Sequence, residues 1–166
     1  MRVEHDSLGA VEVPQDALWG AQTQRALMNF DIGQEHMPFK LIYALAQIKQ
    51  AAAIVNFKLG LIDSLKRDLI IKASTEIIQG LHNNQFPLKI WQSGSGTQTN
   101  MNVNEVISNL ASLEQGNLLG SHQPLHPNDH VNCSQSTNDV FPSAIHLSTT
   151  HDIKYRLLPE LTRFIG

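Results

Sequence analysis

Two segments of the chain concentrate small polar side chains where a folded core would require apolar ones. Residues 93–105 read SGSGTQTNMNVNE, and residues 126–139 read HPNDHVNCSQSTND. Hydroxyls, side-chain amides and backbone N–H groups are neutral hydrogen-bond donors. Such donors bind a carboxylate without locking it into a salt bridge, so the two segments suit a small anionic ligand.

The first segment leads from a Gly-Ser-Gly-Thr stretch into a predicted helix. A helix N-terminus presents free N–H groups and the positive end of the helix dipole, which together favour an anion. Ser, Thr and Asn are also the preferred capping residues, so a purely capping role fits the sequence equally well. We interpret Asn102 and Asn104 as caps at the helix start rather than as ligand contacts.

More specific motifs fail on their spacing. A dinucleotide fingerprint requires a third glycine where the chain has Thr99, and a P-loop requires a lysine that this segment lacks. A nucleophile elbow requires glycines two residues on either side of the serine, but Ser95 lies between Ser93 and Thr97. None of the three motifs is present, so two interpretations of the segment remain open: an anion site and a capped helix start.

Three histidines are spaced four residues apart, at His122, His126 and His130. On a helix they would share one face, but Pro124 and Pro127 exclude that helix. No cysteine or carboxylate pattern completes a zinc set. The sequence therefore predicts no metal site.

Composition excludes several classes of protein. The 166 residues fit one domain, 42% are apolar, and 12 Lys and Arg face 15 Asp and Glu without a basic cluster. A nucleic-acid partner and a polybasic membrane anchor are therefore not expected. With no apolar run of membrane-spanning length, no signal-like N-terminus and a single cysteine, Cys133, the chain is expected to be cytoplasmic, without a disulfide and without a membrane contact.

Helices dominate the predicted secondary structure. Residues 2–4 and 11–13 alternate in polarity and predict a short β-hairpin, and residues 15–37 are expected to be irregular. Apolar spacing by threes and fours predicts helices over residues 39–59, 64–79, 102–113 and from 143 onward, with a long loop over 116–142. Pro159 predicts a kink or break in the last helix. The apolar helical face over residues 157–165 has no predicted partner, so we expect a truncated chain.

Three stretches, read together, resemble the class II fumarase branch of the fumarase/aspartase superfamily: WGAQTQR at residues 19–25, WQSGSGTQTNMNVNEV at 91–106, and HPNDHVN with SQSTND at 126–139. The resemblance implies a mostly α fold. Residues 1–138 would form the N-terminal domain with its short hairpin, and residues 139–166 would begin the first helix of a central helical bundle. It also implies a homotetramer whose active sites are each shared between subunits.

The resemblance implies reversible hydration of fumarate to L-malate without a metal or an organic cofactor. An aspartate ammonia-lyase, which uses similar substrate loops, is the alternative within the superfamily. A non-catalytic dicarboxylate-binding or structural fragment is the alternative outside it. Histidine and serine-loop segments that carry the acid–base chemistry would lie beyond Gly166, so we expect no catalytic residue in this segment and no activity from it alone.

Matched position by position, the resemblance assigns two substrate-binding segments and one secondary site. The substrate-binding residues are Ser95, Gly96, Thr97, Ser136, Thr137 and Asn138. The secondary dicarboxylate site comprises His126, Pro127, Asn128 and Asp129. Two positions depart from the family pattern, since Cys133 stands where a lysine is usual and Thr137 where a serine is frequent. The threonine retains a hydroxyl, whereas the cysteine removes a positive charge near an anion site.

Overall fold

The computed structural model describes the whole chain, from Met1 to Gly166, and is mostly α-helical with one β-hairpin, as the sequence predicts. No helix combines the length and the apolar character that a membrane span requires. In chain order the elements are β1 (Arg2–Asp6), β2 (Gly9–Val13), α1 (Ala21–Asn29), α2 (Phe39–Lys58), α3 (Ser64–Ile78), the 3-10 turn η1 (Asn83–Gln85), α4 (Thr97–Glu114), the π-helical turn η2 (Pro127–Val131), α5 (Thr137–Asp152), the π-helical turn η3 (Ile153–Leu157) and α6 (Leu158–Ile165).

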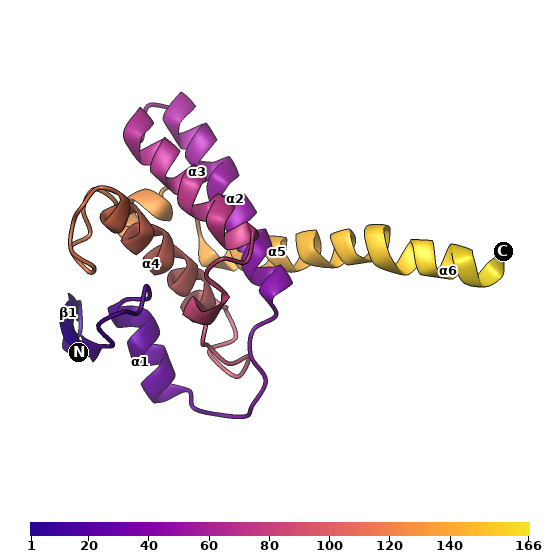
Figure 1. The fold of residues 1–166 in the computed structure, drawn as a ribbon, viewed down its shortest axis with the longest axis horizontal. Coiled ribbons are helices and arrows are strands. Elements are labelled where there is room, and N and C mark those ends of the chain that lie inside the picture. Colours follow the sequence, from indigo (N-terminus) through magenta and orange to yellow (C-terminus); the bar gives the residue numbers. More distant parts are fainter.

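Helix α4 is the centre of the fold. Figure 1 shows it between the α2–α3 pair on one side and α1 with the hairpin on the other. Its Val103, Val106 and Ile107 are completely buried in a core that α2, α3 and the start of α5 complete. Every segment that carries a predicted site residue is therefore positioned against α4 or directly precedes it.

The hairpin is confirmed, with β1 and β2 antiparallel and Arg2 paired with Val13. Two strands bury little surface by themselves and need a further packing partner. Val11 and Val13 supply that contact, because they pack with Ala17 and Ala21 in a small cluster beside Trp19. The hairpin thus rests on the segment that opens α1.

The predicted irregular stretch over residues 15–37 is wrong, because it contains α1. No residue of that stretch caps the helix with its side chain. A distant carboxylate does so instead: Glu105 of α4 accepts hydrogen bonds from the N–H groups of Gly20 (2.9 Å), Gln22 (2.8 Å) and Thr23 (3.1 Å). Burial raises the pKa of the Glu105 carboxyl, while these donors act in the opposite direction.

Helices α2 and α3 confirm the two predictions made from apolar spacing. Each ends within one residue of the predicted end, followed by a glycine with positive φ, Gly60 (72°) or Gly80 (78°). Asp63 caps α3 by accepting a hydrogen bond from the Lys66 N–H (2.9 Å), as expected for an aspartate at that position. Apolar spacing, a capping aspartate and the glycines at the helix ends were therefore sufficient to predict both helices.

Helix α4 begins at Thr97, five residues before the predicted start near Asn102. Asn102 and Asn104 are therefore not caps, and this prediction is wrong. Both are buried inside the helix: Asn102 Nδ2 donates to the Gln85 carbonyl (3.0 Å), and Asn104 Nδ2 donates to Asn132 Oδ1 (3.3 Å). Polar residues can occupy a buried helix face when each finds a partner elsewhere in the fold.

The long loop predicted over residues 116–142 is shorter in the structure. It contains η2, and α5 begins at Thr137 rather than after Pro142. Pro142 lies inside the helix near its start, where the buried side chains of Val140 and Ala144 attach the first turns to the core. Packing therefore maintains the helix despite the missing N–H of the proline.

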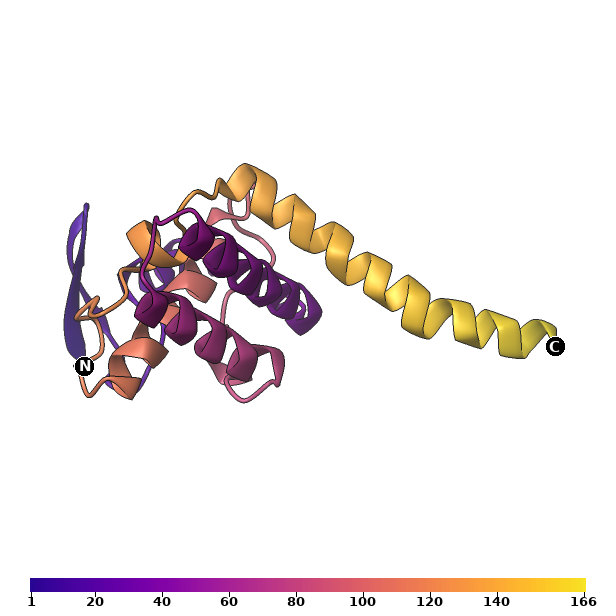
Figure 2. The same ribbon diagram turned by 90° about the horizontal axis from the view of Figure 1, so that it is seen from above.

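Residues 137–165 form one long helical rod that leaves the body of the molecule (Figures 1 and 2). The predicted break at Pro159 does not occur: a π-helical turn, η3, precedes α6, and the helical path continues through Pro159. An ion pair between Lys40 and Asp152 joins α2 to the end of α5. No residue of α6 is buried.

The capping role of Glu105 predicts a large stability loss in Glu105→Ala. Three N–H groups and the Thr23 hydroxyl (2.6 Å) would lose their acceptor while remaining buried or half-buried, so the free energy of unfolding should fall by about 3 kcal/mol. Urea unfolding measures the change. Glu12→Ala, at an exposed position of β2, is the control and should stay within about 0.5 kcal/mol of the parent; equal losses in both variants would contradict the capping role.

Candidate functional site

The first predicted substrate segment lies at the N-terminus of α4. Ser95 and Thr97 are exposed, and their hydroxyl oxygens are 2.9 Å apart. Below them, Gln92 Oε1 accepts hydrogen bonds from both the Thr99 N–H (3.1 Å) and the Thr99 hydroxyl (3.0 Å). The loop is thus attached through Thr99, while the hydroxyls of Ser95 and Thr97 face solvent with the positive end of the helix dipole behind them.

Gly96 brings the second segment beside the first. Its φ of 71° is in the left-handed region, and a Cβ at this position would overlap the ring of Phe141 on α5. Only glycine allows this close approach between the loop and α5. The chain therefore requires glycine at position 96 for both backbone conformation and packing.

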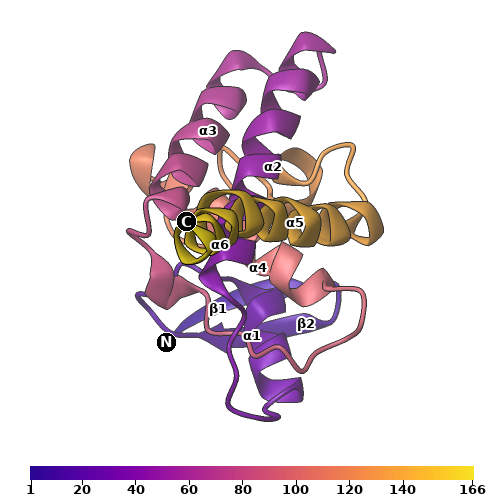
Figure 3. The same cartoon turned by 90° about the vertical axis from the view of Figure 1, so that its right-hand side faces the viewer.

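The second predicted segment leads into α5, with Ser136 at the N-cap position but without a side-chain capping hydrogen bond. Ser136 and Asn138 are exposed, and Thr137 is half-buried. Thr137 Oγ1 accepts a hydrogen bond from Asn100 Nδ2 of α4 (3.1 Å), which links the two helix starts directly. The structure therefore brings all six predicted substrate-binding residues to two neighbouring helix N-termini. Figure 3 shows the beginning of α5 crossing the molecule next to α4.

Sequence reasoning missed the group beneath these two segments, which is Lys49 of α2. Its side chain is completely buried, and its Nζ donates to three amide oxygens: Asn100 Oδ1 (2.8 Å), Asn132 Oδ1 (2.9 Å) and Gln135 Oε1 (2.9 Å). An ammonium group has three donors, and all three are used. The sequence did contain a signal for it: Lys49 lies four residues from both Leu45 and Ala53, which places it on the buried face of α2.

Lys49 has no carboxylate partner. Burial alone lowers its pKa to about 7, because desolvation disfavours the ammonium form and neutral amides compensate only part of that cost. The ammonium form of Lys49 is therefore much less favoured than that of an exposed lysine. This makes the polar contacts beneath the site sensitive to pH in a range where most lysines remain fully charged.

The predicted secondary site is a single turn at η2. His126 Nδ1 accepts hydrogen bonds from the N–H groups of Asn128 (3.3 Å) and Asp129 (3.1 Å), and these two side chains are exposed. Pro127 is buried and anchors the turn. The chain continues from this turn through Val131 and Asn132 to Ser136. The predicted secondary site and the second predicted substrate segment therefore lie on one continuous stretch of chain, but their exposed groups are separate.

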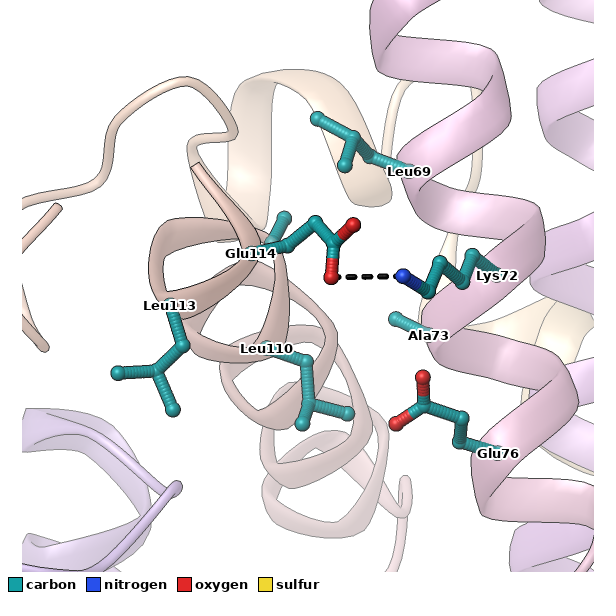
Figure 4. A pocket seen from close by; sticks show the side chains of 8 residues that line it. Leu69, Lys72, Ala73, Glu76, Leu110, Leu113 and Glu114 are labelled. Atoms are coloured by element: carbon teal, nitrogen blue, oxygen red, sulfur yellow. Dashed lines mark ion pairs between the residues drawn. The ribbon is translucent and has the colours of Figure 1, made fainter. Parts of the chain in front are cut away.

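Three further features complete the description of the polar groups. No group of three or more His, Cys, Asp or Glu side chains is arranged to hold a metal ion. Cys133 is half-buried with its thiol 3.7 Å from the Ser134 hydroxyl, and its carbonyl accepts a hydrogen bond from Asn56 Nδ2 (3.0 Å). A groove of about 240 Å³ between α3 and α4 contains none of the predicted site residues and is bridged by the Lys72–Glu114 ion pair at 2.6 Å (Figure 4).

Comparison with known proteins agrees with the resemblance seen in the sequence. A family described as Lyase matches residues 9–166. A class II fumarate hydratase of Prochlorococcus marinus is 62% identical over 164 residues, which are 99% of this chain and 35% of the relative. A class II fumarate hydratase of Thermosynechococcus vestitus is 57% identical, with the same coverage of 99% and 35%. The chain thus spans about a third of the length of these relatives.

Solved structures agree in fold. The crystal structure of recombinant class II fumarase from Schistosoma mansoni superposes with a TM-score of 0.93 at 50% identity, covering 97% of this chain and 34% of that one. The native fumarate lyase:delta crystallin from Brucella melitensis gives 0.89 at 44% identity, covering 93% and 35%.

The lowered pKa of Lys49 predicts an unusual pH dependence of stability. Between about pH 7 and pH 10.5 the unfolded chain binds the lysine proton and the folded chain does not, so stability rises with pH by up to about 1.4 kcal/mol per unit. Urea unfolding at several pH values measures it. In Lys49→Met the free energy of unfolding should no longer rise with pH, whereas Lys58→Met, at an exposed position of α2, should keep the rise. The same dependence on pH in the parent and both variants would contradict the assignment of the rise to Lys49.

The packing of Gly96 predicts that Gly96→Ala destabilises the chain by about 1–3 kcal/mol, through left-handed strain and contact with Phe141. Gly94→Ala is the matched control, because a Cβ at Gly94 meets nothing within 4 Å. Thermal or urea unfolding distinguishes the two. A loss of the same size at both positions would mean that the loop tolerates neither substitution for reasons unrelated to α5.

Proposed function

We propose that this chain, which belongs to the Lyase family, forms the dicarboxylate-binding part of a class II fumarate hydratase that interconverts fumarate and L-malate. The observation that carries the proposal is the juxtaposition of two helix N-termini, those of α4 and α5, each bearing exposed neutral donors. Fumarate and malate each have two carboxylates. Two adjacent anion-binding helix starts suit such a ligand better than a single one would.

The proposed binding mode assigns one carboxylate to each region. The Ser95 and Thr97 hydroxyls and the first N–H groups of α4 would receive one carboxylate. Ser136, Thr137 and Asn138 at the start of α5 would receive the other carboxylate or the group that enters and leaves. Hydroxyl and amide donors bind without introducing a competing charge, so substrate and product can exchange.

The same donors support the chemistry. Removing a proton next to a carboxylate places additional negative charge on that carboxylate, and donors already oriented toward it stabilise the resulting intermediate. Hydroxyls and amides do not titrate near neutral pH, so the two segments provide binding and charge stabilisation rather than a base. We infer that histidine and serine groups from other segments or other subunits supply proton transfer.

The assembly is part of the proposal. Ile153, Leu157 and Leu161 leave an apolar face exposed on the rod that extends from the body of the molecule, and such a face is stabilised by association. A homotetramer that buries the central helices would cover this face and complete the active site with residues of neighbouring subunits. We likewise propose residues 1–138 as the N-terminal domain, residues 139–166 as the beginning of the bundle, a cytoplasmic location, and the η2 turn as a secondary dicarboxylate site.

The assay is hydration of fumarate by the natural full-length protein, followed as loss of fumarate absorbance. Thr97→Ala should lower kcat/KM by about tenfold to a hundredfold, because one donor to the developing charge is removed. Ser64→Ala is the matched control, since Ser64 is also an exposed hydroxyl at the first position of a helix, α3, and should retain parental kinetics.

Other outcomes separate the alternatives. Activity that requires ammonium and yields aspartate would replace the proposal with an aspartate ammonia-lyase. Dicarboxylate binding without turnover would favour a non-catalytic binding protein. The proposal would be overturned if the protein neither converts nor binds any dicarboxylate.

A further inference from the structure

The proposed chemistry makes no use of the most thoroughly buried charge in the chain. Lys49 is completely inaccessible to solvent, and all three of its donors are used within the chain. A buried ammonium is costly, and the three hydrogen bonds to amide oxygens offset only part of that cost. Its position beneath both substrate segments points to an indirect role.

A chain of hydrogen bonds connects Lys49 to the second segment. Asn132 Oδ1 accepts from Lys49 Nζ (2.9 Å), Asn100 Nδ2 (3.0 Å) and Asn104 Nδ2 (3.3 Å), so three donors converge on one neutral oxygen. Asn100 Nδ2 also donates to Thr137 Oγ1 (3.1 Å). Lys49 therefore fixes Asn100 and Asn132, which in turn fix the residue that opens α5.

The same contacts reach the first segment. Asn100 lies in the first turn of α4, and its N–H donates to the Gly96 carbonyl (3.0 Å). Gln135, the third acceptor of Lys49, immediately precedes Ser136. Displacing Lys49 would therefore alter both segments together.

No other charged group compensates the positive charge of Lys49. On the elements packed around α2, Asp63 pairs with Lys66, Glu105 caps α1, and Asp139 is exposed. The thiol of Cys133 lies beside Ser134. Desolvation is accordingly the only cause of the lowered pKa of Lys49. The three amide oxygens depend on the ammonium form, because a neutral amine has two N–H donors and a lone pair.

We propose that Lys49 is a positioning residue for the dicarboxylate site: its ammonium group holds the amide oxygens of Asn100, Asn132 and Gln135 together and thereby fixes Ser136–Asn138 in register with Ser95–Thr97. The inference deepens the proposed function and rests on it for the identity of the ligand. Deprotonation of Lys49 leaves one amide oxygen facing a lone pair, so the two segments lose their mutual register and the dicarboxylate binds less tightly.

A first experiment needs no ligand. Amide NMR signals of Gly96, Thr97, Thr137 and Asn138 are followed against pH in the 166-residue chain. We expect a common inflection within about one unit of pH 7, its disappearance in Lys49→Met, and its shift upward by more than one unit in Asn132→Asp, because a carboxylate favours the ammonium form. Persistence of the inflection in Lys49→Met, or an unchanged inflection in Asn132→Asp, would overturn the proposal.

A second experiment uses the natural full-length protein and fumarate. KM should rise as the pH passes 7 while kcat changes little, and Lys49→Met should show a KM about tenfold higher that no longer depends on this titration. A parental KM in Lys49→Met would contradict the positioning role. If Lys49→Met does not fold, both experiments use Asn132→Asp instead. The pH at which KM rises should then be higher than in the parent protein.

The two proposals fail separately. If the full-length protein binds no dicarboxylate but the NMR inflection behaves as expected, the proposed function is wrong and Lys49 still positions the two segments. If dicarboxylates bind and the inflection is independent of Lys49, the proposed function stands and the positioning role is wrong.

Discussion

The structure depends on a buried ammonium group that has no anion beside it. Lys49 is held by three neutral amide oxygens, two of which belong to the segment that leads into α5 and one to the first turn of α4. Hydrogen bonds in a water-excluded interior are directional, and leaving a buried donor or acceptor unpaired is costly. They therefore restrict the relative position of two elements more closely than non-directional apolar contacts do. Both predicted substrate segments adjoin residues that Lys49 contacts, because Asn100 lies in the first turn of α4 and Gln135 directly precedes Ser136.

The same reasoning explains the unusual polarity of α4. Its buried face includes Asn100, Asn102, Asn104, Glu105 and Ser108, and each makes a hydrogen bond to a residue outside α4. A helix of apolar residues would pack as well but would not specify where the loops around it lie. This face contacts α1, η1 and the segment before α5 directly, and the hairpin in turn rests on the segment that opens α1.

The sequence predicted the parts of the fold that rest on local signals. The α2–α3 pair follows from apolar spacing and from glycines at the helix ends, and the hairpin follows from alternation. The start of α1 and that of α5 could not be predicted, because the first is capped by Glu105 from more than eighty residues away and the second continues through Pro142 only by packing. The six predicted substrate-binding residues came from family resemblance, while Lys49 was overlooked although its spacing placed it on the buried face of α2.

The most direct measurement is a crystal structure of the full-length protein with L-malate bound. We expect one malate carboxylate within hydrogen-bond distance of the Ser95 and Thr97 hydroxyls at the start of α4, with Ser136 or Asn138 contacting the same molecule and Lys49 unchanged beneath them. Malate bound elsewhere, or contacts from only one of the two helix starts, would contradict the claim that these segments form a single dicarboxylate site.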